Sequence, residues 1–185
     1  METISYQDVN SQVIDKCREG DNRAQYELYK LYSKAMFNVS MRITNDYTEA
    51  EDVLQEAFIS AFKNLHTYKG EASFGSWLKK IVVNAAINAI RKRRSELVPM
   101  DERTIGEVPE EVYDDDSEWK VEKVRKAIMK LPDGYRVVLT LYLLEGFDHA
   151  EIGEILGITE STSKSQYSRA KKKLLEIMKE PHFAA

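Results

Sequence analysis

The chain has 185 residues, of which 43% are hydrophobic and 31% charged, and this composition is ordinary for one or two globular domains with modest cores. Only 8 glycines and 4 prolines are present, which permits long helices and argues against an all-β sandwich. No apolar run approaches the roughly 20 residues that span a bilayer. The opening residues METISYQDVN do not have the basic-then-apolar pattern of a secretory signal. We therefore expect a cytoplasmic protein without membrane insertion.

The single cysteine, Cys17, excludes an internal disulfide and any multi-cysteine zinc site. The three histidines, His66, His149 and His182, are scattered, and no Glu-x-x-His pair or glycine-rich phosphate loop is present. We therefore expect neither an enzyme nor a metal or other cofactor.

The net charge of −4 is distributed unevenly. Residues 95–118 contain ten acidic residues and one basic residue, so the rest of the chain has 26 basic and 21 acidic residues and a net charge of +5. Two stretches, 72–95 with six basic residues and 161–173 with five, contain no acidic residue. Basic patches of this kind are suited to binding the phosphates of nucleic acids. Basic runs are also common at solvated helix ends, where the helix dipole favours them, so charge alone leaves both interpretations open.

The N-terminal part predicts one helical domain, residues 1–94. Two helices are expected at 5–19 and 22–43, with a break between them at Gly20-Asp21.

Two further helices are expected in the same domain. Thr48 and Glu51 form a capping-box pattern at the start of the first of them. The segment 67–77 contains two glycines and predicts a loop, after which a long helix is expected from about Ser76 to Arg94.

Residues 95–118 predict an extended acidic linker, because prolines and like charges interrupt any helical period. The C-terminal domain, residues 119–185, predicts four short-to-medium helices, the first of them at 121–131. The expected fold class is therefore all-α, with two small helical domains joined by an acidic linker.

Residues 148–174 have the spacing of a helix-turn-helix: a short helix with Asp148 as N-cap, a turn that starts at Gly157, and a longer helix with Thr159 as N-cap. One stripe of the longer helix is expected to face inward: Tyr167, Ala170, Leu174 and Ile177. The opposite face carries hydroxyls and cations suited to a major groove: Ser161, Lys164, Ser165, Ser168, Arg169 and Lys172. An ordinary helical hairpin with a polar exterior is the alternative.

Two stretches resemble the extracytoplasmic-function (ECF) group of sigma-70 family RNA polymerase sigma factors. Residues 49–94, with the order DVLQEAF, FGSWL and RKRR, resemble the second sigma region, and residues 124–178 resemble the fourth. The resemblance implies an alternative sigma factor that binds core RNA polymerase and directs promoter-specific transcription initiation and DNA opening. Its implied partners are core RNA polymerase, promoter DNA and an anti-sigma factor.

The resemblance implies that Asp52, Gln55 and Glu56 dock on the clamp coiled coil of the largest polymerase subunit. Their spacing places them on one helix face, opposite Leu54 and Phe58, so a carboxylate-rich patch is available to a basic partner. Simple solubilising charge is the alternative interpretation of these residues.

The resemblance also implies that the N-terminal domain captures unstacked bases of the minus-ten element. Stacking surfaces and a pocket are needed for this. The matching residues are Tyr68, Phe74, Lys79, Lys80, Asn84, Asn88 and Arg91. Phe74 and Trp77 are equally compatible with core packing, which is the favoured role of Trp77. A pocket role is favoured for Asn84, because a buried amide on an apolar helix needs a partner.

The resemblance further implies that the helix-turn-helix reads the minus-thirty-five element. Ser163 stands where the family usually has an apolar residue, and Gln166 and Tyr167 replace the usual Arg and Leu. These departures bear on which bases are recognised. The alternative function is a helix-turn-helix regulator that acts as a dimer without being a polymerase subunit. Such regulators usually carry a ligand or phosphoacceptor domain, and the sequence has no receiver-like alternation of strands and helices.

Overall fold

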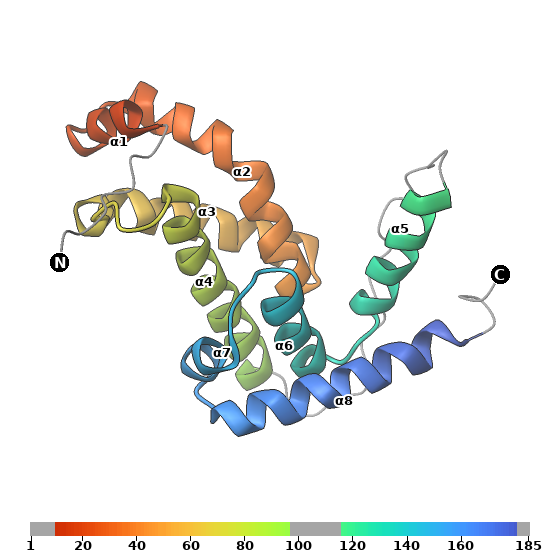
Figure 1. Cartoon of the computed structure of the whole chain (residues 1–185). Coiled ribbons are helices and arrows are strands. Elements are labelled where there is room, and N and C mark those ends of the chain that lie inside the picture. Colours follow the sequence, from red (N-terminus) through yellow and green to blue (C-terminus); the bar gives the residue numbers. More distant parts are fainter. Residues whose placement is uncertain (1–9, 97–115, 181–185) are drawn as a thin grey trace. The chain divides into compact units, whose positions relative to one another are not determined.

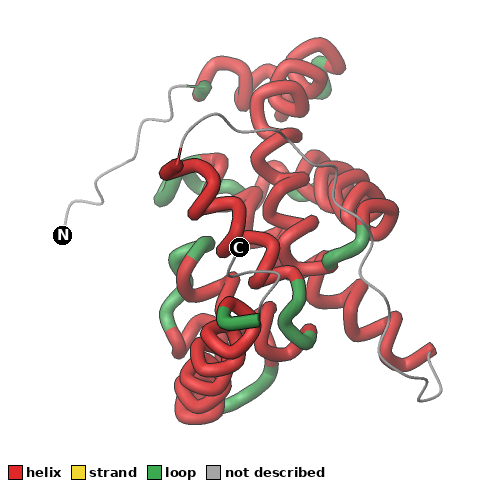
Figure 2. Tube along the Cα trace, turned by 90° about the vertical axis from the view of Figure 1, so that its right-hand side faces the viewer, coloured by secondary structure: helices red, strands yellow, loops and turns green. Residues whose placement is uncertain are grey.

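The computed structural model describes residues 10–96 and 116–180, and all regular structure within these residues is helical (Figures 1 and 2). The chain divides into two compact units, Met1–Leu97 (unit 1) and Val98–Ala185 (unit 2). The expected all-α fold with two helical domains is confirmed. The first residues of the helix expected at 5–19 and most of the expected acidic linker lie outside the described residues. No helix in the described ranges is long and apolar enough to cross a membrane.

Unit 1 is a bundle of three long helices with one shorter helix packed on it. Its described elements are α1 (Ser11–Arg18), α2 (Asn22–Thr44), α3 (Tyr47–Lys63), the 3₁₀ turn η1 (Leu65–Thr67) and α4 (Phe74–Glu96). Helices α2, α3 and α4 pack pairwise against one another, and α1 contacts α2 and η1. The apolar stripe of each helix supplies the core, whose fully buried members include Leu28, Ile43, Ala61, Phe74, Leu78 and Val82.

A two-residue turn, Asn45-Asp46, joins α2 to α3. Asn45 has a left-handed φ of 57°, which asparagine adopts more readily than most residues, and it ends α2. The Asp46 carboxylate caps α3 by accepting a hydrogen bond of 2.9 Å from the backbone N–H of Glu49. The expected capping box at Thr48 and Glu51 is therefore wrong, because an aspartate two residues earlier takes the N-cap position.

The long helix α4 begins earlier than expected. The Ser73 hydroxyl accepts a hydrogen bond of 3.2 Å from the backbone N–H of Ser76, so the helix starts at Phe74 instead of Ser76. At the other end α4 continues to Glu96, and the next helix starts at Asp116. A few residues at each end of the expected linker, 95–118, are therefore helical.

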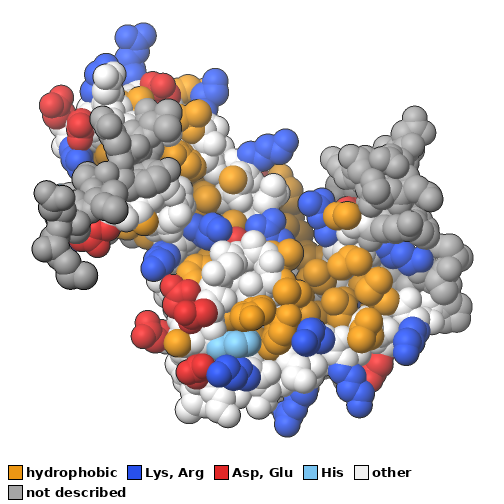
Figure 3. Space-filling model, viewed as in Figure 1, with side chains coloured by type: hydrophobic (Ala, Val, Ile, Leu, Met, Phe, Trp, Pro, Cys, Tyr) orange, Lys and Arg blue, Asp and Glu red, His pale blue; other side chains and the backbone are white. Residues whose placement is uncertain are grey.

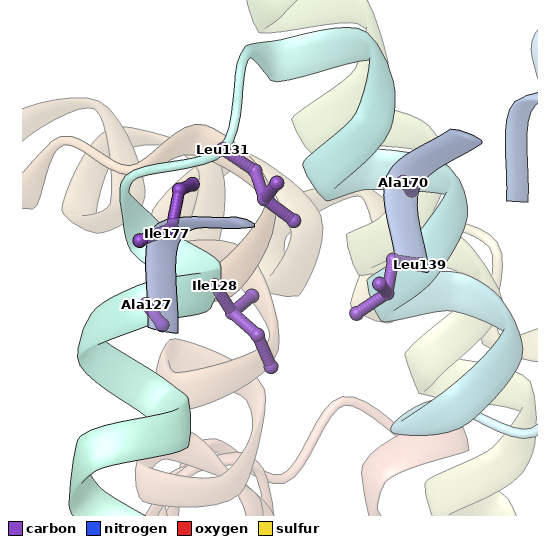
Figure 4. Packing of buried hydrophobic residues seen from close by; sticks show 6 residues of the cluster. All are labelled: Ala127, Ile128, Leu131, Leu139, Ala170 and Ile177. Atoms are coloured by element: carbon purple, nitrogen blue, oxygen red, sulfur yellow. The ribbon is translucent and has the colours of Figure 1, made fainter. Parts of the chain in front are cut away.

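Unit 2 contains the four expected helices, α5 (Asp116–Met129), α6 (Asp133–Leu143), α7 (His149–Leu156) and α8 (Glu160–Met178), of which α5 starts before the expected residue 121 and ends before residue 131. Helix α8 contacts the other three helices (Figure 1). Six buried residues from α5, the turn after it, α6 and α8 form the cluster in Figure 4: Ala127, Ile128, Leu131, Leu139, Ala170 and Ile177. Tyr167 and Leu174 pack against this cluster. The inward stripe expected for α8 is therefore confirmed.

Candidate nucleic-acid interfaces

Helices α7 and α8 form a helix-turn-helix in which each end is capped. The Asp148 carboxylate accepts a hydrogen bond of 2.8 Å from the Glu151 backbone N–H, and the Glu151 carboxylate accepts one of 3.0 Å from the Asp148 N–H. Gly157, with a φ of 67°, ends α7. The Thr159 hydroxyl caps α8 by accepting a hydrogen bond of 3.1 Å from the Thr162 backbone N–H. The caps expected at Asp148, Gly157 and Thr159 are confirmed.

The turn between these helices requires a glycine within α7. A Cβ atom on Gly153 would lie 2.8 Å from the Ile158 carbonyl oxygen, closer than real side-chain atoms approach. The Ile158 backbone N–H donates a 3.0 Å hydrogen bond to the Gly153 carbonyl. Only a residue without a side chain permits this approach, so Gly153 fixes where α8 emerges from the turn.

All six residues predicted on the outer face of α8 are exposed: Ser161, Lys164, Ser165, Ser168, Arg169 and Lys172. At 100° per residue, four of the others lie within about 60° of Ser165, and Lys164 lies about 100° to one side. Figure 3 shows Lys and Arg side chains spaced along the outer edge of this helix. The face has the predicted composition, and its contact with DNA stays a prediction.

An acidic residue lies beside that face. The Lys164 ammonium forms an ion pair of 2.6 Å with the Glu160 carboxylate, and both side chains are more than half exposed. The hydrogen bond to Glu160, together with the charge of Glu160, raises the pKa of Lys164 above its ordinary value. The acid-free stretch recognised in the sequence starts one residue later, at Ser161, so this pair was missed.

Ser163 stands at the position where the family resemblance predicts an apolar residue. It is fully buried and forms a 2.9 Å hydrogen bond with Nδ1 of His149. The His149 ring stacks on Tyr142 with centroids 4.4 Å apart, and the Tyr167 centroid lies 4.6 Å from that of Tyr142. A buried hydroxyl needs such a partner. These polar and aromatic contacts join α6, α7 and α8, and they were not predicted from the sequence.

In unit 1, Asp52, Gln55 and Glu56 are all exposed on α3, whereas Leu54 and Phe58 on the other side of the helix are buried. The predicted division of α3 into a polar and an apolar face is therefore confirmed. Docking of polymerase on the polar face stays a prediction.

Two predicted base-stacking residues are buried. Tyr68 is 6% exposed and Phe74 is 0% exposed. Their ring centroids lie 5.6 Å apart, and each lies 5.5 Å from Trp77, which belongs to the same aromatic cluster. Stacking on an extruded base needs an accessible ring face. The expected stacking role of Tyr68 and Phe74 is therefore not supported, because both rings are buried in this cluster, where Phe74 also packs on Tyr32 of α2.

Asn84 is exposed, so the expectation of a buried amide is wrong. Lys80, Asn88 and Arg91 are also exposed and lie within about 40° of Asn84 around the helix axis. These four residues form one polar face of α4. Lys79 is partly buried and about 140° away from Asn84, so it does not belong to this face.

The basic stretch of α4 is also partly used for packing. The Arg93 guanidinium donates to the Glu49 carboxylate at 2.9 Å and to the Thr44 carbonyl at 3.3 Å. Arg93 therefore connects α4 to the ends of α2 and α3. Arg93 also belongs to the basic stretch 72–95, which the sequence suggests could meet phosphates.

The described residues thus present three one-sided polar faces: carboxylates and an amide on α3, amides and cations on α4, and hydroxyls and cations on α8. A helix-turn-helix whose exposed face carries hydroxyls and cations is typical of DNA-binding proteins, and this chain combines one with a second helical module.

Comparison with known proteins gives the family. The family model of sigma-70 region 2 matches residues 28–96, and that of sigma-70 region 4 matches residues 122–174. The ECF RNA polymerase sigma factor SigW of Bacillus subtilis (strain 168) is 29% identical over 179 residues, which cover 90% of this chain and 95% of SigW. The ECF RNA polymerase sigma factor SigM of the same organism is 31% identical over 149 residues, covering 80% of this chain and 91% of SigM.

The chain belongs to the ECF group of sigma-70 family RNA polymerase sigma factors. It is an alternative sigma factor that directs transcription, and the dimeric regulator is not favoured. The fold agrees with a solved structure, the sigma factor RpoE in complex with the anti-sigma factor NepR from Bartonella quintana. That chain superimposes with a TM-score of 0.60 at 23% identity, covering 84% of this chain and 97% of the other.

Proposed function

We propose that this sigma factor divides promoter recognition among its three polar helix faces. The α8 face reads the duplex minus-thirty-five element, the α4 face and the loop 68–73 hold the single-stranded minus-ten element, and the α3 face docks on core RNA polymerase. The observation that carries the proposal is that each helix buries one side and exposes a polar side of suitable chemistry. These are binding roles that require no catalysis. Because bacterial polymerase works on the chromosome, we place the protein in the cytoplasm.

The α3 face is the docking surface in this proposal. Asp52, Gln55 and Glu56 suit a basic partner, and the family resemblance implies that this partner is the clamp coiled coil of the largest polymerase subunit. We expect the double variant Asp52→Lys/Glu56→Lys to lose core polymerase in pull-down while circular dichroism shows an intact fold.

The matched control for this experiment is Glu19→Lys/Glu27→Lys, which changes the net charge equally at two other exposed positions of unit 1. If the folded α3 variant still captures polymerase, or if the control loses it equally, the docking assignment is wrong.

Variants of the two proposed DNA-binding faces should affect two successive steps, promoter binding for α8 and strand opening for α4. Arg169→Ala should remove a phosphate contact from α8, so we expect lower promoter occupancy. The slope of log affinity against log salt concentration should become shallower by about one, because about one counterion fewer is released on binding. Asn84→Ala should leave occupancy nearly intact and reduce the number of permanganate-reactive, open thymines. Footprinting and permanganate probing of holoenzyme on one promoter, chosen by run-off transcription from genomic fragments, measure both effects. Identical or exchanged defects in the two variants would contradict this division.

We propose in addition that an anti-sigma factor binds this chain. The support is the fold that it shares with RpoE, which was solved in complex with the anti-sigma factor NepR. A genuine anti-sigma factor should compete with core polymerase for the chain, which pull-down with increasing amounts of each candidate protein would measure.

A further inference from the structure

Arg18, the last residue of α1, contacts the loop that precedes α4, fifty residues later in the sequence. Its Nη2 atom donates a 2.6 Å hydrogen bond to the Tyr68 carbonyl, and its guanidinium carbon lies 5.9 Å from the centre of the Tyr68 ring. Its Nη1 atom forms a 2.8 Å ion pair with Asp15, one turn earlier in α1. One guanidinium therefore connects α1 to the first residue of the loop.

Tyr68 carries this connection across the loop. Its ring is buried against Phe74 and Trp77, and its hydroxyl donates a 2.8 Å hydrogen bond to the Ala72 carbonyl. The residues between these two contacts include Lys69 and Glu71, both exposed. The backbone that presents them is therefore fixed at one end by Arg18 and at the other by the Tyr68 hydroxyl.

Helix α1, which carries Arg18, is closely packed against its neighbours. Ile14 and Cys17 are 2% and 4% exposed, and α1 packs on both α2 and η1. Burial, followed by the charges of Asp21 and Glu27, raises the pKa of the Cys17 thiol to about 11, which agrees with a closely packed interface. A planar guanidinium can serve two acceptors at once, whereas a lysine ammonium at the same position is a single point charge.

We infer that Arg18 is a positioning residue for minus-ten recognition: through Tyr68 it sets the backbone of the loop 68–73 that faces the promoter. This inference rests on the function proposed above for that loop. In this inference, helix α1 influences base preference by positioning the loop and does not itself contact DNA.

The first test measures loop order in the free, full-length chain by hydrogen exchange. We expect Arg18→Ala to raise the exchange rates of the Thr67 and Tyr68 amides, which donate hydrogen bonds to the Asn64 and Leu65 carbonyls where the loop starts, roughly tenfold, because a charge-assisted hydrogen bond that is partly exposed is lost. Exchange within α3 and the middle of α4 should not change. Arg18→Lys keeps the charge and one donor and should give a smaller increase. The matched control is Arg23→Ala, which removes an equal charge from an exposed position at the start of α2. Unchanged loop exchange in Arg18→Ala would overturn the inference.

The second test measures base preference with core polymerase, by transcription from promoters in which each minus-ten base is changed singly. We expect Arg18→Ala to reduce the ratio between cognate and changed minus-ten sequences roughly tenfold and to leave the preference at the minus-thirty-five element intact. A purely structural role would lower transcription from all these promoters equally, and that result would overturn the inference. If Arg18→Ala folds poorly, Arg18→Lys takes its place in the same comparison.

The double variant Lys69→Ala/Glu71→Ala distinguishes the inference from the proposed function. If this loop variant leaves minus-ten preference unchanged, the loop does not read DNA, and the inference about Arg18 fails with it. If the loop variant changes the preference and both Arg18 variants do not, the loop function stands and only the role of Arg18 is wrong.

Discussion

Unit 1 and unit 2 each expose a polar helix face that is proposed to bind DNA, on α4 and on α8, but the side chains packed beside those two faces differ in chemistry. At the start of α4, Phe74 and Trp77 of the helix form an aromatic cluster with Tyr68 of the preceding loop, with centroids 5.5 to 5.6 Å apart. Next to α8, the hydrogen-bonded pair of Ser163 and His149 packs with the rings of Tyr142 and Tyr167. The comparison shows that an aromatic residue in a segment predicted to read DNA can belong to the buried core, while its polar neighbours form the exposed surface.

The largest effect expected from this difference is in unit 1. Phe74 is fully buried, so Phe74→Ala should destabilise the unit by about 3–5 kcal/mol through lost burial and an incompletely filled cavity. Asn84→Ala, at an exposed position of the same helix, should change stability by no more than about 0.5 kcal/mol. Thermal unfolding followed by circular dichroism compares the two variants.

Phe74→Leu keeps an apolar side chain and serves if the alanine variant does not fold. A Phe74→Ala protein of normal stability that fails only in strand opening would show that the ring acts on DNA, contrary to its position in the core.

The fold was largely predictable because its signals are local. Asp148, Gly157 and Thr159 mark the turn of the helix-turn-helix by residue type and spacing alone, and helical periodicity separates buried from exposed sides of α3 and α8. The start of α3 was misplaced because Asp46 and Thr48 are both good N-cap residues and lie two positions apart.

The supporting contacts of the site were not predictable in the same way. Arg18 with Tyr68, Arg93 with Glu49 and His149 with Ser163 are separated by 50, 44 and 14 residues. Such pairs depend on how helices pack, and the periodicity of a single helix does not contain this information. Tyr68 and Phe74 were misjudged for a related reason: an aromatic side chain suits both a core and a stacking surface.

A smaller effect is expected in unit 2, where the backbone of the turn leaves no room for a side chain. Gly153→Ala places a methyl group 2.8 Å from the Ile158 carbonyl and should destabilise unit 2 by about 1–3 kcal/mol while weakening minus-thirty-five binding by holoenzyme. Gly134→Ala is the matched control, because a Cβ there meets nothing within 4 Å, and it should be neutral or stabilise α6 by up to about 1 kcal/mol. Thermal unfolding and footprinting measure the two effects, and equal stabilities of the two variants would refute the steric argument.

The smallest expected effect concerns Glu160, the acidic residue at the edge of the α8 face. Its carboxylate lies 2.6 Å from the Lys164 ammonium, so it competes with DNA phosphate for that cation and also repels DNA directly. Removing the charge with Glu160→Gln should therefore tighten binding of holoenzyme to the duplex minus-thirty-five element by about two- to fivefold, measured by fluorescence anisotropy at low salt. The gain should shrink as salt rises, because both side chains are well exposed and their charges are screened.

Glu176 provides the matched control on the same helix. It pairs with Lys173 at 3.4 Å, near the end of α8 away from the helix-turn-helix turn. Glu176→Gln changes the net charge of the chain by the same amount, so it should leave affinity nearly unchanged if the effect is local to Glu160. An equal gain in both variants would mean that affinity follows net charge alone. A loss of affinity in Glu160→Gln would mean that the pair orients Lys164 for its contact, because the ammonium would then bind phosphate better when held by Glu160 than when released from it.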